Sequence, residues 1–203
     1  MRAIIYVAIC LLTGCLSRPP LNKQTFIFSP TPTASRGVGG GNRVIKIRTL
    51  QVAEPFQGRS FVYRTGEYSY QRDPYAEFMV PPADGLITPI CSWLRETGDF
   101  SAVVEAGSAL KPDTLIEIQV VQLYGDFRQS ARPTAVLTMR FVFFDAPGGL
   151  PGRVILQHEY SRSIPLKART APDLITGWNH ALAQILDSAA LDFSNVDPNA
   201  LKP

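Results

Sequence analysis

The chain has 203 residues, and 20 lysines and arginines face 17 aspartates and glutamates, which gives a formal net charge of +3. No cluster of five basic residues occurs, which argues against nucleic acid as a partner. The chain holds only two histidines, and it lacks both His-x-x-x-His spacing and a Gly-x-Ser-x-Gly elbow. We therefore expect a protein that is not an enzyme, with no catalytic residues and no metal site.

The first segment has the pattern of a bacterial lipoprotein signal peptide. A basic start, Met1-Arg2, precedes the apolar run 3–12, which is too short to cross a bilayer as a helix of roughly twenty residues. The run ends Leu12-Thr13-Gly14-Cys15, which resembles a lipobox, in which the cysteine thiol receives a diacylglycerol. We expect residues 1–14 to be removed and Cys15 to carry a diacylglycerol and an N-acyl chain, with no other cofactor. The alternative is an incidental thiol in a signal peptide that is cut elsewhere.

The residue after the cysteine bears on which membrane holds the anchor. In Gram-negative bacteria an Asp at this place resembles an inner-membrane retention signal, whereas this chain has Leu16. We therefore expect the lipid anchor to hold the protein at the periplasmic face of the outer membrane. Cys91 would be the one unmodified thiol of the mature chain, so an intrachain disulfide is excluded, and its apolar neighbours predict a buried side chain.

Residues 15–42 are expected to form the lipidated N-terminus and a flexible linker. They are rich in Pro, Ser, Thr and Gly and end in a Gly-rich run, 36–42. A phosphate-binding loop would need Gly-Lys-Ser/Thr at the start of a helix, whereas Arg43 begins a strand pattern. Within the linker, 25–28 is a β-prone island that could be an edge strand of the domain.

The pattern from 43 to 192 predicts a single α+β domain, and 193–203 a polar tail. In the first half, strands are expected at 44–52, 60–64, 68–71 and 77–80, and a helix at 84–97. Pro89 either kinks this helix or marks its first turn. In the second half, strands are expected at 115–124 (with a bulge at Val120-Val121), 135–144 and 154–160. Thr170 is expected to open a second helix, whose apolar stripe runs to about Leu191. This order favours a mostly antiparallel sheet with two main helices packed on one face.

Several segments resemble the ABC-type transport auxiliary lipoproteins, the PqiC-like family. The resemblance rests on the lipobox, the strand 45–52, and the segment Gln57 to Arg64, which contains the Arg-x-x-x-Tyr-Arg pattern and is followed by Tyr68 and Tyr70. It continues with the Pro81-Pro82-Ala83-Asp84 helix start and with Phe100 at the end of that helix. It implies a membrane-anchored periplasmic component that docks an MCE-type (PqiB- or MlaD-like) protein of an ABC transporter, so that phospholipid passes between the inner and outer membranes. A homo-oligomer would be compatible with a ring-forming partner of this kind.

Two surfaces are candidates for docking. The first is a run of aromatic residues interleaved with arginines, because both residue types are favoured at the centres of interfaces. Its members are Arg59, Tyr63, Arg64, Tyr68, Tyr70, Tyr75 and Phe78. Half of these could instead face the core from alternating strand positions. The second candidate is an exposed edge of the sheet, which could accept a partner strand.

Two other functions remain open at this stage. A lipid carrier would need a cavity lined by residues such as Leu137, Phe141, Phe143 and Trp178, which as packed core would leave no such space. A cell-envelope scaffold unrelated to transport would bind neither a lipid nor an MCE protein.

Overall fold

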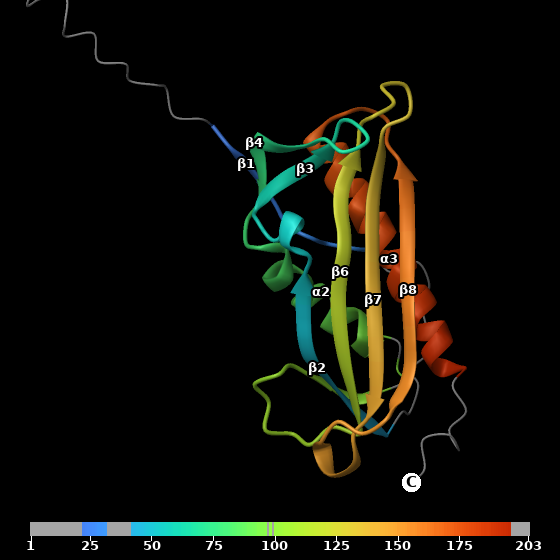
Figure 1. Cartoon of the computed structure of the whole chain (residues 1–203). Helices are drawn as coiled ribbons and strands as arrows, with labels where there is room; N and C mark the ends of the chain where they lie inside the picture. The colour runs from blue at the N-terminus through green and yellow to red at the C-terminus, as the bar shows by residue number, and fades with distance from the viewer. Residues whose placement is uncertain (1–21, 32–41, 97, 99, 196–203) are drawn as a thin grey trace, which may run out of the picture.

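The computed structural model describes residues 22–31, 42–96, 98 and 100–195 (Figure 1). The expected signal peptide, Cys15 and most of the Gly-rich run lie outside these residues, as does most of the expected tail. Within the described part of the chain, no helix is both long and apolar enough to cross a bilayer.

The described residues form one mixed sheet of eight strands with two helices. The strands are β1 (Gln24–Phe26), β2 (Arg43–Val52), β3 (Ser60–Arg64), β4 (Tyr70–Phe78), β5 (Phe100–Val104), β6 (Thr114–Asp126), β7 (Thr134–Asp145) and β8 (Val154–Pro165). The helices are α2 (Pro82–Glu96) and α3 (Ala171–Ser194), and two 3-10 turns, η1 (Glu54–Phe56) and η2 (Pro147–Gly149), follow β2 and β7.

The longest strands of the sheet, β6, β7 and β8, form an antiparallel ladder. β7 pairs with β6 on one side and with β8 on the other, over almost its whole length. On its other edge β6 pairs in parallel first with β2 and then, at its end, with β3. β3 continues antiparallel into β4, and β1 joins β4 in parallel. The antiparallel pairs hold most of the paired residues, as the sequence predicts.

Both helices lie on the same face of the sheet (Figure 1), which confirms the predicted arrangement. The Thr170 side chain caps α3 by accepting a hydrogen bond from the Asp173 amide, 3.2 Å away. The apolar stripe of α3 packs on β7 and β8, and α2 packs on β2 and β5. Trp178 is fully buried at the centre of this layer, where its indole N–H donates to the carbonyl oxygens of Val136 and Tyr124.

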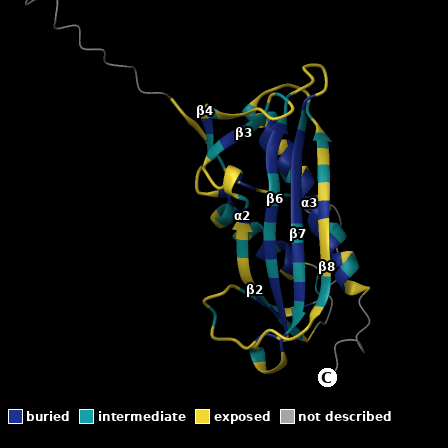
Figure 2. Ribbon diagram, in the orientation of Figure 1, coloured by how far each residue is buried: buried dark blue, intermediate teal, exposed yellow. Residues whose placement is uncertain are grey.

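Among the described residues no α-helix covers the second face of the sheet, and η1 packs on it at Tyr124 through Phe56. Figure 2 shows the burial of each residue. Alternate residues of β6 and β7 point to this open face, among them Gln119, Arg140 and Thr138, which bond to side chains of neighbouring strands. The bulge predicted in β6 is present, because the register with β7 shifts between Val120 and Gln122. The predicted burial of Cys91 is confirmed, and burial raises the pKa of its thiol.

Four expectations from the sequence need correction. Residues 70–78 form one strand where two were expected, because β3 pairs with this segment on both sides of Pro74, at 70–72 and at Glu77. The helix begins at Pro82 and passes through Pro89. Phe100 does not close this helix but begins β5, a parallel partner of β2.

The fourth correction concerns the start of the domain. Gln24–Phe26 is a strand of the sheet, and Phe28 is buried against Phe78. The folded domain therefore begins near residue 22 and not at 43, and the expected linker of residues 15–42 is divided by a part of the domain itself. The β-prone island at 25–28 was considered as a possible edge strand, and β1 does lie at the edge of the sheet, beside β4.

Candidate docking site

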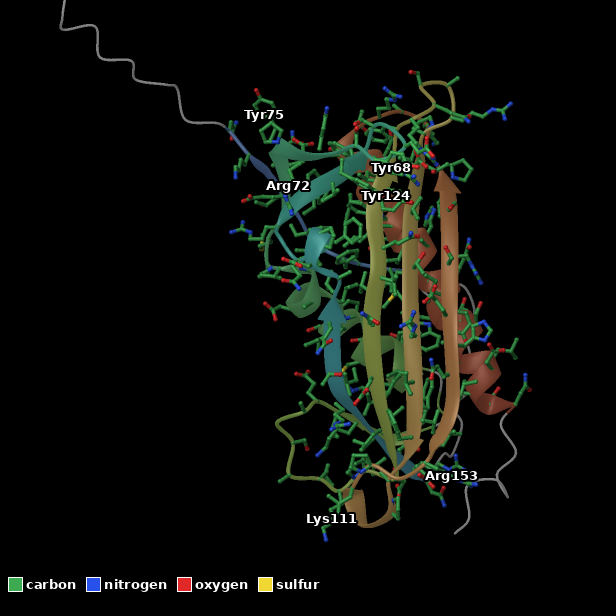
Figure 3. All side chains as sticks on the ribbon, in the orientation of Figure 1. Tyr68, Arg72, Tyr75, Lys111, Tyr124 and Arg153 are labelled. Carbon is green, nitrogen blue, oxygen red and sulfur yellow. The ribbon has the colours of Figure 1, made fainter. Side chains whose placement is uncertain are left out.

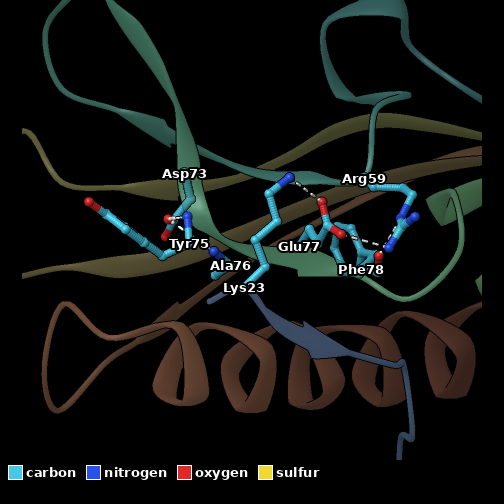
Figure 4. Close-up of polar contacts among 7 residues, drawn as sticks. All are labelled: Lys23, Arg59, Asp73, Tyr75, Ala76, Glu77 and Phe78. Atoms are coloured by element: carbon cyan, nitrogen blue, oxygen red, sulfur yellow. Dashed lines mark hydrogen bonds and ion pairs between the residues drawn. The ribbon is translucent and has the colours of Figure 1, made fainter. Parts of the chain in front are cut away.

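The β3–β4 region carries most of the residues predicted for docking, and a bend in β4 sets their directions. At this bend Asp73 Oδ1 accepts hydrogen bonds from the backbone amides of Tyr75 (2.7 Å) and Ala76 (3.0 Å). The other carboxylate oxygen of Asp73 accepts from the Tyr63 hydroxyl. Figure 4 shows that Tyr75 points away from this cluster. One carboxylate thus holds the bend at Pro74, where no ladder bond is available.

Tyr63 is only partly exposed, because its ring stacks on Phe127 with centroids 4.7 Å apart. Burial, followed by the hydrogen bond to Asp73, raises the pKa of its hydroxyl well above the ordinary value of 10. Tyr63 therefore supports the fold of this region and remains neutral at physiological pH. Arg64 is also partly buried, with its guanidinium 5.9 Å from the centre of the Tyr70 ring.

Three of the predicted tyrosines are open to solvent. The exposed fractions of Tyr68, Tyr70 and Tyr75 are 88%, 47% and 58%. Large aromatic side chains at such exposure are candidates for contact with a partner or a membrane. They do not form one patch, however: Tyr70 contacts Tyr124 on the open face of the sheet, whereas Tyr75 lies farther along β4, near the start of β1 (Figure 3).

A groove of about 270 Å³ lies between η1 and β4 beside Tyr70. It is lined by Pro55, Phe56, Val62, Tyr70, Gln71 and Arg72. We call it the η1–β4 groove. Tyr124 forms edge-to-face contact with Tyr70 at 5.6 Å and stacks on Phe56 at 5.9 Å, which fixes both rings. Arg72 is held by a hydrogen bond to the carbonyl oxygen of Pro55, 3.1 Å long.

The groove combines rigid aromatic walls with an exposed guanidinium, a composition typical of the centre of an interface. Phe56 and Tyr124 were not predicted for it. Phe56 is distant in sequence from β4, and the position of Tyr124 depends on the parallel pairing of β3 with β6. The sequence signal that was available is the Pro55-Phe56 pair directly after a strand, which is typical of a short turn.

The two remaining predicted residues have structural roles. Phe78 is only 3% exposed and packs against Phe28, Phe61 and Trp178, so it belongs to the core and is not available to a partner. Arg59 donates to the carbonyl oxygen of Phe78 at 2.9 Å and to Glu77 at 2.7 Å (Figure 4).

Glu77 forms ion pairs with both Arg59, just before β3, and Lys23, just before β1. It also accepts a hydrogen bond from Lys23 at 3.0 Å, and this bond, followed by the charge of Arg59, lowers the pKa of its carboxyl. Lys23 directly precedes β1, so the ion pairs connect the start of the domain to β3 and β4. Arg59 therefore stabilises the position of β1 indirectly, through Glu77. It does not line the η1–β4 groove.

Among the described residues, the core has no space for an acyl chain at the position that a lipid carrier would need. A cavity between α2, α3 and the sheet is lined entirely by apolar side chains, including Phe141 and Phe143, but its volume is about 10 Å³. Sites for drug-sized ligands are about 300 to 1,000 Å³. Trp178, the other wall that a carrier would use, is packed against Phe61 and Phe78. These residues form a closed core.

No group of three or more His, Cys, Asp or Glu side chains in the described ranges is placed to hold a metal ion. The η1–β4 groove is a candidate binding surface. Its chemistry is that of aromatic stacking, apolar contact and hydrogen bonds from arginine.

Comparisons with known proteins agree with this architecture. Protein XCC0632 from Xanthomonas campestris is 15% identical, with a TM-score of 0.68 over 81% of this chain and 92% of that one. An uncharacterized protein of known structure is 12% identical, with a TM-score of 0.68 over 85% and 99% of the two chains. The hypothetical protein CT253 from Chlamydia trachomatis is 11% identical, with a TM-score of 0.50 over 77% and 98%. At these identities the likeness shows a shared fold.

Among curated protein sequences, no significant match to this chain is found. The model of one protein family, described as the ABC-type transport auxiliary lipoprotein component, matches residues 26–190. This range begins in β1 and ends in α3, so it covers nearly the whole folded domain. The chain therefore belongs to the family of ABC-type transport auxiliary lipoprotein components.

Proposed function

We propose that this protein is a non-catalytic docking component of an MCE-type ABC transporter that moves phospholipid between the inner and outer membranes. Lipid chains on Cys15 hold it at the periplasmic face of the outer membrane, and the folded domain binds the MCE protein. Membership of the auxiliary lipoprotein family supports a role beside a transporter. The lipobox pattern around Cys15 supports the anchor.

The observation that carries the proposal is the η1–β4 groove. Tyr70 and Arg72 are both exposed at its rim, and the buried Tyr124 fixes the rings of Tyr70 and Phe56 from below. Such preorganised aromatic side chains lose little conformational entropy when a partner binds. The packed core favours an adaptor over a lipid carrier, because an adaptor needs a surface and no cavity.

The test is a pull-down of the membrane-extracted, full-length protein, with mass spectrometry of the bound proteins and lipids. We expect an MCE protein to be recovered. The affinity should then fall at least about 30-fold in Tyr70→Ala, the value of an interface residue worth about 2 kcal/mol. Tyr75→Ala is the matched control, since it removes an exposed tyrosine from the same strand outside the groove.

Other results would contradict parts of the proposal. Stoichiometric phospholipid without a protein partner would indicate a carrier. Recovery of neither would indicate a scaffold of the cell envelope. Recovery of an MCE protein with unchanged affinity in Tyr70→Ala would exclude the η1–β4 groove. It would favour an open edge of the sheet as the docking surface, such as that of β8, which pairs with β7 alone among the described strands.

A further inference from the structure

The folded domain begins very close to the expected lipid anchor. Gln24 is the first residue of β1 and pairs with Ala76 of β4. Residues 16–23 alone separate it from Cys15, and a segment of this length spans at most about 29 Å when fully extended. Figure 1 shows that the chain enters β1 at the upper end of the domain, the end at which β6 and β8 finish. This short connection limits how the domain can sit on a membrane.

The opposite orientation is excluded by the length of the sheet. β6 has 13 residues, and at about 3.3 Å per residue it is roughly 43 Å long. If the domain stood on its lower end, the start of β1 would lie roughly 40 Å above the membrane. The connection to Cys15 could not reach that far. An anchored domain therefore stands on its upper end or lies on its side.

The upper end is the basic end of the domain. Two loops meet there, 127–133 between β6 and β7 and 166–170 between β8 and α3 (Figure 1). They contribute four exposed basic residues and no acidic one: Arg128, Arg132, Lys167 and Arg169. The hairpin 65–69 adds one acidic residue, Glu67. Arg128 is paired with Asp126 at 2.6 Å, and the other three form no ion pair among the described residues.

The lower end offers a comparison within the same chain. Its loops, 105–113 and 146–153, contain Lys111 and Arg153, which Figure 3 labels, but also the acidic residues Glu105 and Asp113. Their charges cancel. The loops of the end that the connection to Cys15 holds near the membrane therefore carry a net positive charge, and the loops of the lower end do not.

An exposed aromatic residue lies at the same end. Tyr75 is 58% exposed and its neighbour Ala76 pairs with Gln24, so the ring lies beside the point where the chain enters the domain. Figure 3 shows it projecting outward there. Tyrosine is enriched at membrane interfaces, because its ring is apolar and its hydroxyl is polar. The basic residues of the two loops lie at this same end of the domain, and exposed basic residues are typical of a surface that binds lipid headgroups.

We propose that this end of the domain is a second, non-covalent membrane-binding surface, formed by loops 127–133 and 166–170 together with Tyr75. It takes the anionic headgroups of phospholipids in the membrane that holds the anchor, so the inference rests on the proposed lipidation of Cys15. The domain then stands upright on the membrane. The η1–β4 groove opens to the side, because Tyr124 lies on the open face of the sheet, near the upper end of β6.

The test uses the full-length mature lipoprotein, reconstituted into vesicles of phosphatidylcholine alone or with three tenths phosphatidylglycerol. Flotation reports the anchor, and hydrogen–deuterium exchange reports the contact of each loop. We expect the protein to float with both kinds of vesicle. Exchange in 127–133 and 166–170 should slow only with phosphatidylglycerol, and 105–113 should be unaffected.

A matched pair of double variants tests the charges. Each basic residue near an anionic surface strengthens binding about five-fold, so Arg132→Glu with Lys167→Glu should lower the ratio of docked to undocked domains at least about 25-fold. Lys111→Glu with Arg153→Glu changes the net charge equally at the lower end and should retain the protection of both loops. High salt should abolish the protection in the wild type.

The possible failures are distinguishable. A protein that floats, but whose loops exchange equally with both vesicles, would overturn the second membrane surface and leave the anchor intact. A protein that does not float with either vesicle would overturn the anchor, and with it the geometric argument. Loops that become protected only when an MCE protein is added would show that this end binds protein and not lipid.

Discussion

Replacing Asp73 should destabilise the domain more than its exposed surroundings suggest. The Asp73→Ala substitution removes the acceptor for the amides of Tyr75 and Ala76 and for the Tyr63 hydroxyl. At roughly 1 kcal/mol for each hydrogen bond, with Ala76 buried, we expect a loss of about 2 to 4 kcal/mol in the free energy of unfolding. For a domain of this size, that loss lowers the melting temperature by about 4 to 16 °C.

The matched variants separate the three bonds. Asp73→Asn retains an oxygen that can accept from both amides, and its amide group can donate to the Tyr63 hydroxyl, so about 1 kcal/mol or less should be lost. Tyr63→Phe keeps the stacking on Phe127 and removes one bond, with a loss of about 1 kcal/mol. Urea denaturation of the mature protein measures all three. Equal losses in Asp73→Ala and Asp73→Asn, or no loss in either, would refute the role assigned to this carboxylate.

Two further predictions concern packing and pH. Gly177→Ala in α3 should destabilise the domain by about 1 to 3 kcal/mol, because the added Cβ would lie 2.7 Å from the Cβ of Ala135. The Cβ added in Gly85→Ala in α2 would have only ordinary contacts, so this variant should stabilise the domain by up to about 1 kcal/mol. Similar melting temperatures for the two variants would contradict this packing. Burial and a carboxylate partner raise the pKa of both Tyr63 and Tyr160 above 10. Above pH 10 the unfolded chain therefore ionises first and stability should fall as the pH rises, and chemical denaturation of the double Phe variant should show a smaller fall.

The sequence predicts well those elements that depend on local pattern. The ladder β6–β7–β8 follows from alternation, and α3 follows from its apolar stripe and the Thr170 cap. The parallel strand β5 was not predicted, because five residues after a helix carry too little periodicity. β1 is shorter still, and its place is decided by tertiary contacts, such as the stacking of Phe28 on Phe78.

The candidate site was predicted only in part, for a similar reason. Alternation along one strand identifies which residues share a face, but the bend at Asp73 changes the phase of β4 between Tyr70 and Phe78. The run of aromatic residues is therefore divided among the groove, the core and the upper end. The groove itself needs Phe56 and Tyr124, which the parallel pairing of β3 with the end of β6 brings to Tyr70.

The position of β1 also limits what a docking component with this anchor can do. A long flexible linker would let the domain search far from the membrane, whereas residues 16–23 allow at most about 29 Å. Because the η1–β4 groove lies in the upper half of a domain roughly 43 Å long, it stays within about 70 Å of the membrane in any orientation. On the proposed lipid anchor, a partner of this groove would therefore have to reach this membrane, as an elongated conduit does. In return, confinement near the membrane raises the effective concentration of the groove for a partner that arrives there, so that a weak contact can suffice.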